Sequence, residues 1–174
     1  MHALFFDMQP KAGHMPHYFE HVDRLRPLLA AHPGMLYLER FRPLDQPDAI
    51  LSHQHWADEA AIRAWRCDGT HRQSQAAGRA VHFEQYRIRV GPEVAPEGAG
   101  RFVVAAYGAA AAGPGRVYES VTRAGRFLTL AEAAQGELAR DIAAQAQADG
   151  AEEVRIFAVS RDYSLTDRAE APAL

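Results

Sequence analysis

Histidine and tryptophan side chains between residues 50 and 75 are the groups most suited to chemistry. His53 and His55 stand two apart in AILSHQHW, and Trp65 and His71 flank the glycine of AIRAWRCDGTHRQSQAAGR. A neutral histidine is a general base near pH 7. Tryptophan supplies an apolar wall for a pocket or a large core side chain. This pattern predicts proton abstraction from a small molecule, or simple packing.

The strand that contains both histidines raises a geometric conflict. Side chains two apart in a strand share a face, so His53 and His55 are predicted to point together and Trp56 to point the other way. The three cannot line one cavity unless a bulge intervenes. The histidines are pocket groups if their face is the inner one, and solvated side chains if it is the outer one.

Trp65 and His71 also have two readings. Trp65 follows Ile62 by three residues on a predicted helix, so core packing explains it without a ligand. His71 follows Thr70, which with Gln73 forms a predicted capping box, and would face either solvent or a cavity mouth.

Two further sets of polar residues receive other interpretations. His14, His17 and His21 have a spacing that suits a transition metal, but His14 precedes Pro16 and no carboxylate clearly accompanies them, so no metal site is predicted. The alternating pairs Arg40 and Arg42, and Arg87 and Arg89, indicate solvated strand faces, with a substrate anion contact as the alternative.

Composition excludes several classes of protein. The 174 residues are 48% hydrophobic and 24% charged with a net charge of -3, which is typical of a globular protein and does not favour nucleic-acid binding. The single Cys67 excludes an internal disulfide and favours a reducing, cytoplasmic setting. No apolar run approaches the roughly 20 residues of a membrane span. Phosphate-loop and dinucleotide fingerprints are absent, and no cofactor is expected.

The first half of the chain has the periodicity of a βαββαβ unit. Its predicted strands are 2–8, 35–42, 49–56 and 82–90, and its predicted helices run from Pro16 to His32, with a kink at Pro27, then from Asp58 and from Thr70. That order is the ferredoxin-like arrangement.

The second half repeats this pattern with its first helix deleted. After a linker at 91–100, the predicted strands are 101–107, 117–123, 127–130 and 154–165, and the helix is 137–148. The predicted domains are 1–92 and 100–168, with a tail at 169–174. The fold class is therefore α+β, with two sheets face to face around a cavity, either within one chain or between two.

The runs PGMLYLERFRP and HWADEAAIRAWRCDGTHRQSQAAGRAVHFEQYRIRV resemble the antibiotic biosynthesis monooxygenase family, over about residues 1–92. The resemblance implies a ferredoxin-like dimeric α/β barrel, hence a homodimer. It also implies oxidation of a phenol to a quinone by molecular oxygen without metal or flavin. In the quinone-forming members a tryptophan at the end of the third strand lines the pocket, and Trp56 matches it. The family's asparagine four positions earlier is Ser52 here.

Haem-degrading members of the same family use an asparagine on the first strand, a tryptophan on the second helix and a histidine ten residues later. Asp7, Trp65 and Gln75 occupy these places, so haem degradation is disfavoured.

The hypothesis that follows is a cofactor-independent monooxygenase acting on an aromatic or quinol-type small molecule. The expected catalytic residues are His71, His53 and His55. The expected substrate-binding residues are Trp56, Trp65, Ser52 and Tyr37. A non-catalytic small-molecule-binding barrel is the alternative, and a haem-binding or haem-degrading protein is the second alternative.

Overall fold

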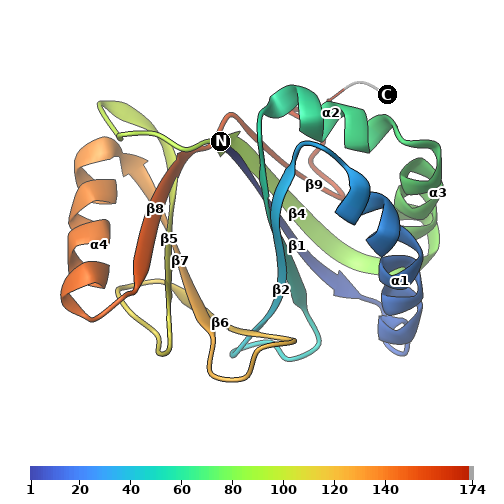
Figure 1. Cartoon of the computed structure of the whole chain (residues 1–174), viewed down its shortest axis with the longest axis horizontal. Helices are drawn as coiled ribbons and strands as arrows, with labels where there is room; N and C mark the ends of the chain where they lie inside the picture. The colour runs from blue at the N-terminus through green and yellow to red at the C-terminus, as the bar shows by residue number, and fades with distance from the viewer. Residues whose placement is uncertain (173–174) are drawn as a thin grey trace.

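The structure is a computed structural model that describes residues 1–172, in which one nine-stranded sheet curls until its halves face each other (Figure 1). Its strands are β1 (His2–Pro10), β2 (Met35–Pro43), β3 (Ile50–Trp56), β4 (Phe83–Pro92), β5 (Ala99–Gly108), β6 (Arg116–Ser120), β7 (Phe127–Gln135), β8 (Glu153–Ala158) and β9 (Arg161–Ser164). Its helices are α1 (Met15–Ala31), α2 (Glu59–Cys67), α3 (Gly69–Ala77), the π-helix η1 (Gly78–His82) and α4 (Gly136–Ala148). Helices α1 to α3 cover one outer face, and α4 covers the other.

Strand order shows that the two halves are copies of one plan. The sheet runs β8-β5-β7-β6-β2-β3-β1-β4-β9. From the shared middle outward, the first half reads β2-β3-β1-β4 and the second reads β6-β7-β5-β8, which is the same ferredoxin-like order. A loop at 109–115 stands where the first half has α1. The predicted α+β fold with an abbreviated second half is confirmed.

The barrel closes within one chain. On one side β2 pairs with β6, and on the other side β4 lies against β8 through a bridge between Glu93 and Phe157. Beside that bridge, the backbone N–H of Ser160 donates to the carbonyl of Val90 at 2.9 Å. Gly91 permits this approach, because a Cβ there would lie 1.6 Å from the carbonyl oxygen of Ala158. The halves are therefore joined by backbone contacts on both sides of the barrel, between β2 and β6 and between β4 and β8.

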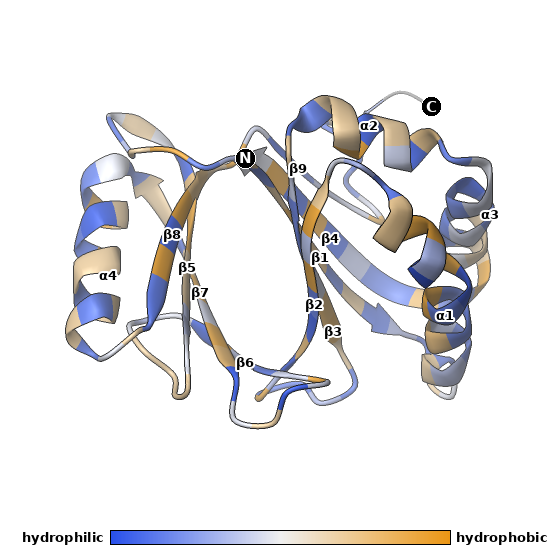
Figure 2. Ribbon diagram, viewed as in Figure 1, coloured by the Kyte–Doolittle hydropathy of each residue, from blue (hydrophilic) through white to orange (hydrophobic). Residues whose placement is uncertain are grey.

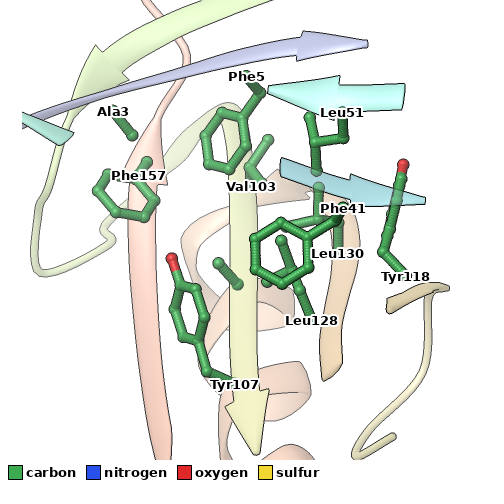
Figure 3. Packing of buried hydrophobic residues seen from close by; sticks show 11 residues of the cluster. Ala3, Phe5, Phe41, Leu51, Val103, Tyr107, Tyr118, Leu128, Leu130 and Phe157 are labelled. Atoms are coloured by element: carbon green, nitrogen blue, oxygen red, sulfur yellow. The ribbon is translucent and has the colours of Figure 1, made fainter. Parts of the chain in front are cut away.

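Side chains from both halves fill the barrel (Figure 3). Phe5, Phe41 and Leu51 come from the first half and meet apolar side chains of the second. Phe5 packs edge-to-face on Phe157 with ring centroids 5.6 Å apart. Figure 2 shows apolar residues along the strands of both halves and mixed polarity on α4. The two halves of the sheet thus share one core, which explains why neither half leaves its inner face open.

Helix α1 continues through Pro27, which is exposed near its last turn, so water can satisfy the freed carbonyl. Two local expectations are wrong. Asp68, not Thr70, caps α3, because its side chain accepts the N–H of His71 at 2.8 Å. The strand predicted at 154–165 divides into β8 and β9, and β9 pairs with β4 of the first half.

Two remaining points concern the ends and the helices. Of the predicted tail at 169–174, residues 173 and 174 lie outside the described residues. Within residues 1–172, none of the helices combines the length and the apolar character that a membrane crossing requires.

Candidate substrate cavity

A cavity of about 460 Å³ lies between the outer face of the first half-sheet and the helices α1 to α3. Strand register places its floor in two rows across the sheet. The first row is Arg40, Ser52, Phe6, Ile88 and Tyr163, and the second is Gln54, Leu4, Val90 and Arg161. Leu4, Phe6 and Ile88 are only half-buried although they lie at the centre of the sheet. Apolar side chains at the centre of the floor with polar ones around them are typical of small-molecule sites.

Trp65 and His71 form the helical wall, and two aspartates position them. Asp58 caps α2 by accepting the N–H of Ala61 at 2.8 Å, and Trp65 then faces the sheet from this helix. Asp68 ends α2 and begins α3, which brings His71 back over Trp65. The two rings stack with centroids 4.3 Å apart and an interplanar angle of 17°.

The surroundings of His71 leave it a neutral base. Its Nδ1 lies 2.9 Å from the backbone oxygen of Trp65, and a carbonyl only accepts, so Nδ1 carries the proton and Nε2 keeps a lone pair. Burial lowers the pKa of His71, while the Trp65 carbonyl and the charge of Asp68 oppose that shift. The imidazole is therefore a neutral base, and its Nε2 lies 3.4 Å from Gln75 Nε2, an amide nitrogen that can donate to it.

Polar side chains of β3 continue the floor. Trp56 Nε1 donates to Gln54 Oε1 at 3.0 Å, and Gln54 Nε2 donates to Ser52 Oγ at 3.1 Å. Trp56 itself is fully buried against the ring of His32, with centroids 5.2 Å apart, and supports the floor without lining the cavity. Ser52 and Gln54 do line it.

The family model described as antibiotic biosynthesis monooxygenase matches residues 1–77, which include Trp65 and His71. Residues 1–77 are thus similar to this family. The resemblance given by the two sequence runs is thereby confirmed. The match covers β1 to α3, the segment that supplies the helical wall and most of the floor of the cavity.

Two curated relatives match part of the chain. The chain is 35% identical over 91 residues to the jasmonate monooxygenase ABM of Pyricularia oryzae, a match that covers 52% of the chain and 42% of that protein. It is 34% identical over 73 residues to the uncharacterized protein YqjZ of Bacillus subtilis, covering 42% of the chain and 62% of that protein. The chain thus spans less than two thirds of either relative.

Solved structures are similar at lower identity. Protein SO0527 of Shewanella oneidensis matches 51% of the chain and 86% of its own length, with 13% identity and a TM-score of 0.48. An anthrone oxidase-like protein matches 99% of the chain and 96% of its own length, with 10% identity and a TM-score of 0.43.

The structure divides the candidate residues of the first half between two places. Trp65, His71 and Ser52 line the cavity under the helices. His53, His55 and Tyr37 lie on the opposite face of the sheet, inside the barrel. The predicted separation of the two histidines from Trp56 is confirmed, and no bulge brings the three together.

Inside the barrel, the two histidines meet a tyrosine from the second half. His53 Nε2 lies 2.6 Å from the hydroxyl oxygen of Tyr107 and 3.1 Å from His55 Nε2. Tyr37 stacks on His55 with centroids 4.7 Å apart. Burial lowers the pKa of His53 well below its usual range and that of His55 to about 4, and burial raises the pKa of Tyr107. This cluster is a neutral hydrogen-bonded group in the core.

Sequence reasoning missed Tyr107, which comes from β5. The apolar run 102–107 indicates a buried strand, but the partners of Tyr107 depend on how the halves meet.

The three positions that correspond to the haem-degrading set, Asp7, Trp65 and Gln75, lie on two sides of the sheet. Asp7 binds Arg89 at 2.6 Å and accepts the Tyr118 hydroxyl at 3.1 Å inside the barrel, on the opposite side of the sheet from Trp65. Gln75 lines the cavity. The three positions therefore do not converge on one ligand site.

The other cavity, of about 560 Å³, opens at the end of the barrel and is lined by charged residues that neutralise each other. Arg89, which the sequence predicted on a solvated face, is 4% exposed and bridges Asp7 and Glu132. Arg87 bridges Glu132 and Asp162. Because these arginines already bind carboxylates of the protein, this opening has fewer free charged groups to bind a substrate than the cavity under helices α1 to α3, called the helical cavity below.

The histidines of α1 gather near the mouth of the helical cavity. His14 Nδ1 lies 3.1 Å from His82 Nδ1, and the ring centroid of His17 lies 5.3 Å from that of His82. Among residues 1–172, no group of three or more His, Cys, Asp or Glu side chains has the arrangement of a metal site.

Proposed function

We propose that this protein is a cofactor-independent monooxygenase that oxidises an aromatic or quinol-type small molecule with molecular oxygen. The observation that supports it is the stacked pair of Trp65 and His71 on the wall of an apolar cavity, within the segment that matches the antibiotic biosynthesis monooxygenase family. A curated relative that matches over 91 residues is named a monooxygenase. Fold alone would not choose the reaction, but this wall supplies a base beside an aromatic surface.

The proposed reaction begins with proton removal. The Nε2 atom of His71 takes the phenolic proton, and the resulting phenolate reduces oxygen by one electron more readily than the phenol does. The radical pair then recombines at a ring carbon. Phenol and O₂ give quinone and water, so one oxygen atom enters the product and the other leaves as water. The two hydrogens of that water come from the hydroxyl group and from the attacked ring carbon.

The remaining lining residues orient the ring. The stacked Trp65 and His71 form one wall, and Leu4, Phe6 and Ile88 form the opposite one, so a planar substrate lies between helices and sheet. We assign the base to His71 and not to His53 or His55, because only His71 of these three lines the cavity.

Oxygen consumption tests this proposal. Protein freed of metal and flavin is mixed with a panel of anthrone and hydroquinone compounds, alongside His71→Ala and the control His17→Ala, which removes an exposed histidine of α1. A general base contributes about 10²–10⁴-fold, so His71→Ala is expected to lower the rate by that factor while His17→Ala does not. Tight ligand binding without oxygen uptake by the unmodified protein would instead support a non-catalytic binding barrel.

A further inference from the structure

The helical cavity has a one-sided charge. Among the residues that the structure describes, its lining includes no aspartate or glutamate, but it includes Arg40, Arg63, Arg79, Arg161 and Arg168. Of these, Arg161 binds Glu59 at 2.9 Å. A pocket lined by one sign of charge raises the local concentration of ligands of the opposite sign. The cavity is thus biased toward anionic small molecules.

Arg40 is the arginine built into the cavity floor. It is half-buried on β2, and its Nε donates to the hydroxyl oxygen of Tyr18 on α1 at 3.1 Å. Within residues 1–172 it forms no ion pair with a carboxylate. Arginines that are partly withdrawn from water are ordinarily paired, so an arginine without a carboxylate partner beside a cavity favours an anionic ligand there.

Two hydroxyl groups next to Arg40 are also donors. Tyr18 uses its oxygen to accept from Arg40, and burial raises the pKa of Tyr18, so its O–H hydrogen stays in place. Ser52 is the cross-strand partner of Arg40, and its oxygen accepts from Gln54 Nε2, which leaves its own hydrogen to donate. All three residues line the cavity. This end of the cavity therefore combines a guanidinium and two O–H donors with no carboxylate to accept from them.

We propose that the cavity takes an apolar small molecule that carries a carboxylate, and that Arg40, Tyr18 and Ser52 bind this carboxylate. A guanidinium fork matches the two oxygens of a carboxylate, and such charge-assisted bonds are about twice as strong as neutral ones. The apolar remainder of the ligand lies over Phe6 and Ile88 toward Trp65. This inference rests on the proposed function, because it names the substrate class of the same site.

Calorimetric titration of the full chain with 1-naphthaleneacetate and with 1-naphthaleneacetamide tests the inference, since the two ligands share a ring system and differ in charge. The acetate is expected to bind at least tenfold more tightly than the amide. Hydrogen bonds to a charged group predict that Arg40→Gln weakens acetate binding by about 10- to 100-fold and leaves amide binding unchanged. Tyr18→Phe is expected to weaken it less.

Arg42→Gln is the matched control, because Arg42 lies two residues further along β2, is exposed and does not line the cavity. It removes the same charge and is expected to leave the affinity for the acetate unchanged. Thermal unfolding of each variant shows that the fold is retained.

Three results would overturn the carboxylate subsite: equal affinity for the acetate and the amide, acetate affinity unaffected by Arg40→Gln, or no binding of either ligand. Titration consumes no oxygen, so its outcome is independent of the monooxygenase assay. An active oxygenase that binds acetate and amide equally would refute the subsite alone, and selective acetate binding without oxygen uptake would refute the reaction alone.

Discussion

Substituting Gly91 by alanine tests the closure of the barrel within one chain. The new Cβ would lie 1.6 Å from the Ala158 oxygen and 3.1 Å from the Ser160 nitrogen, against an ordinary contact of 3.4 Å or more. Both neighbours are backbone atoms, so no side-chain rotation relieves the clash. Strands β4 and β8 must separate, which weakens the hydrogen bond from Ser160 to Val90.

The magnitude follows from these two effects. Overpacking costs about 1–3 kcal/mol and a weakened hydrogen bond about 1 kcal/mol, so the free energy of unfolding should fall by about 2–4 kcal/mol. For a chain of this size the melting temperature should fall by about 4–16 °C. Gly69→Ala is the control, because its Cβ meets nothing within 4 Å and alanine favours the helix by up to about 1 kcal/mol.

Urea and thermal unfolding followed by circular dichroism measure both variants. If Gly91→Ala unfolds at the same midpoint as the unmodified chain while Gly69→Ala is neutral or stabilising, the close contact between β4 and β8 is wrong and the barrel does not close there.

Two other predictions concern stability and the position of the base. The pKa of His55 is lowered to about 4 by burial, so the unfolded chain binds more protons between pH 4 and 6.5. Stability should then be fully present above pH 6.5 and decline as the pH falls toward 4; a histidine NMR titration that gives an ordinary pKa would contradict this. Asp68→Ala should cost about 1 kcal/mol of stability through the lost cap and should weaken oxygen uptake by displacing His71. Uptake that is unchanged, at a lowered melting temperature, would show that the cap does not position the base.

Periodicity and turn residues were sufficient to predict both ferredoxin-like halves, because each strand and helix buries one face and repeats at its own spacing. They were not sufficient for β9. The segment 154–165 contains no glycine or proline to mark a break, and it divides because residues around Ser160 bond to Val90 of β4. That pairing depends on how the halves meet, which no local pattern records.

In the candidate site too, local patterns predicted some features, and others depended on tertiary packing. The opposite facing of His55 and Trp56 was predictable because it depends only on strand alternation. The stacking of His71 on Trp65 was not, because it depends on Asp68 serving both helices. Arg40 was predicted on a solvated face and lies in the cavity floor, since the helices that cover it are set by tertiary packing.

Incubation of metal-free, flavin-free protein with ¹⁸O₂ and an oxidisable anthrone, followed by mass spectrometry of the product, tests the central claim most directly. The account predicts one ¹⁸O atom in each quinone product and the loss of this incorporation in His71→Ala. Ligand that stays bound and unoxidised, or a product that contains no ¹⁸O, would contradict it.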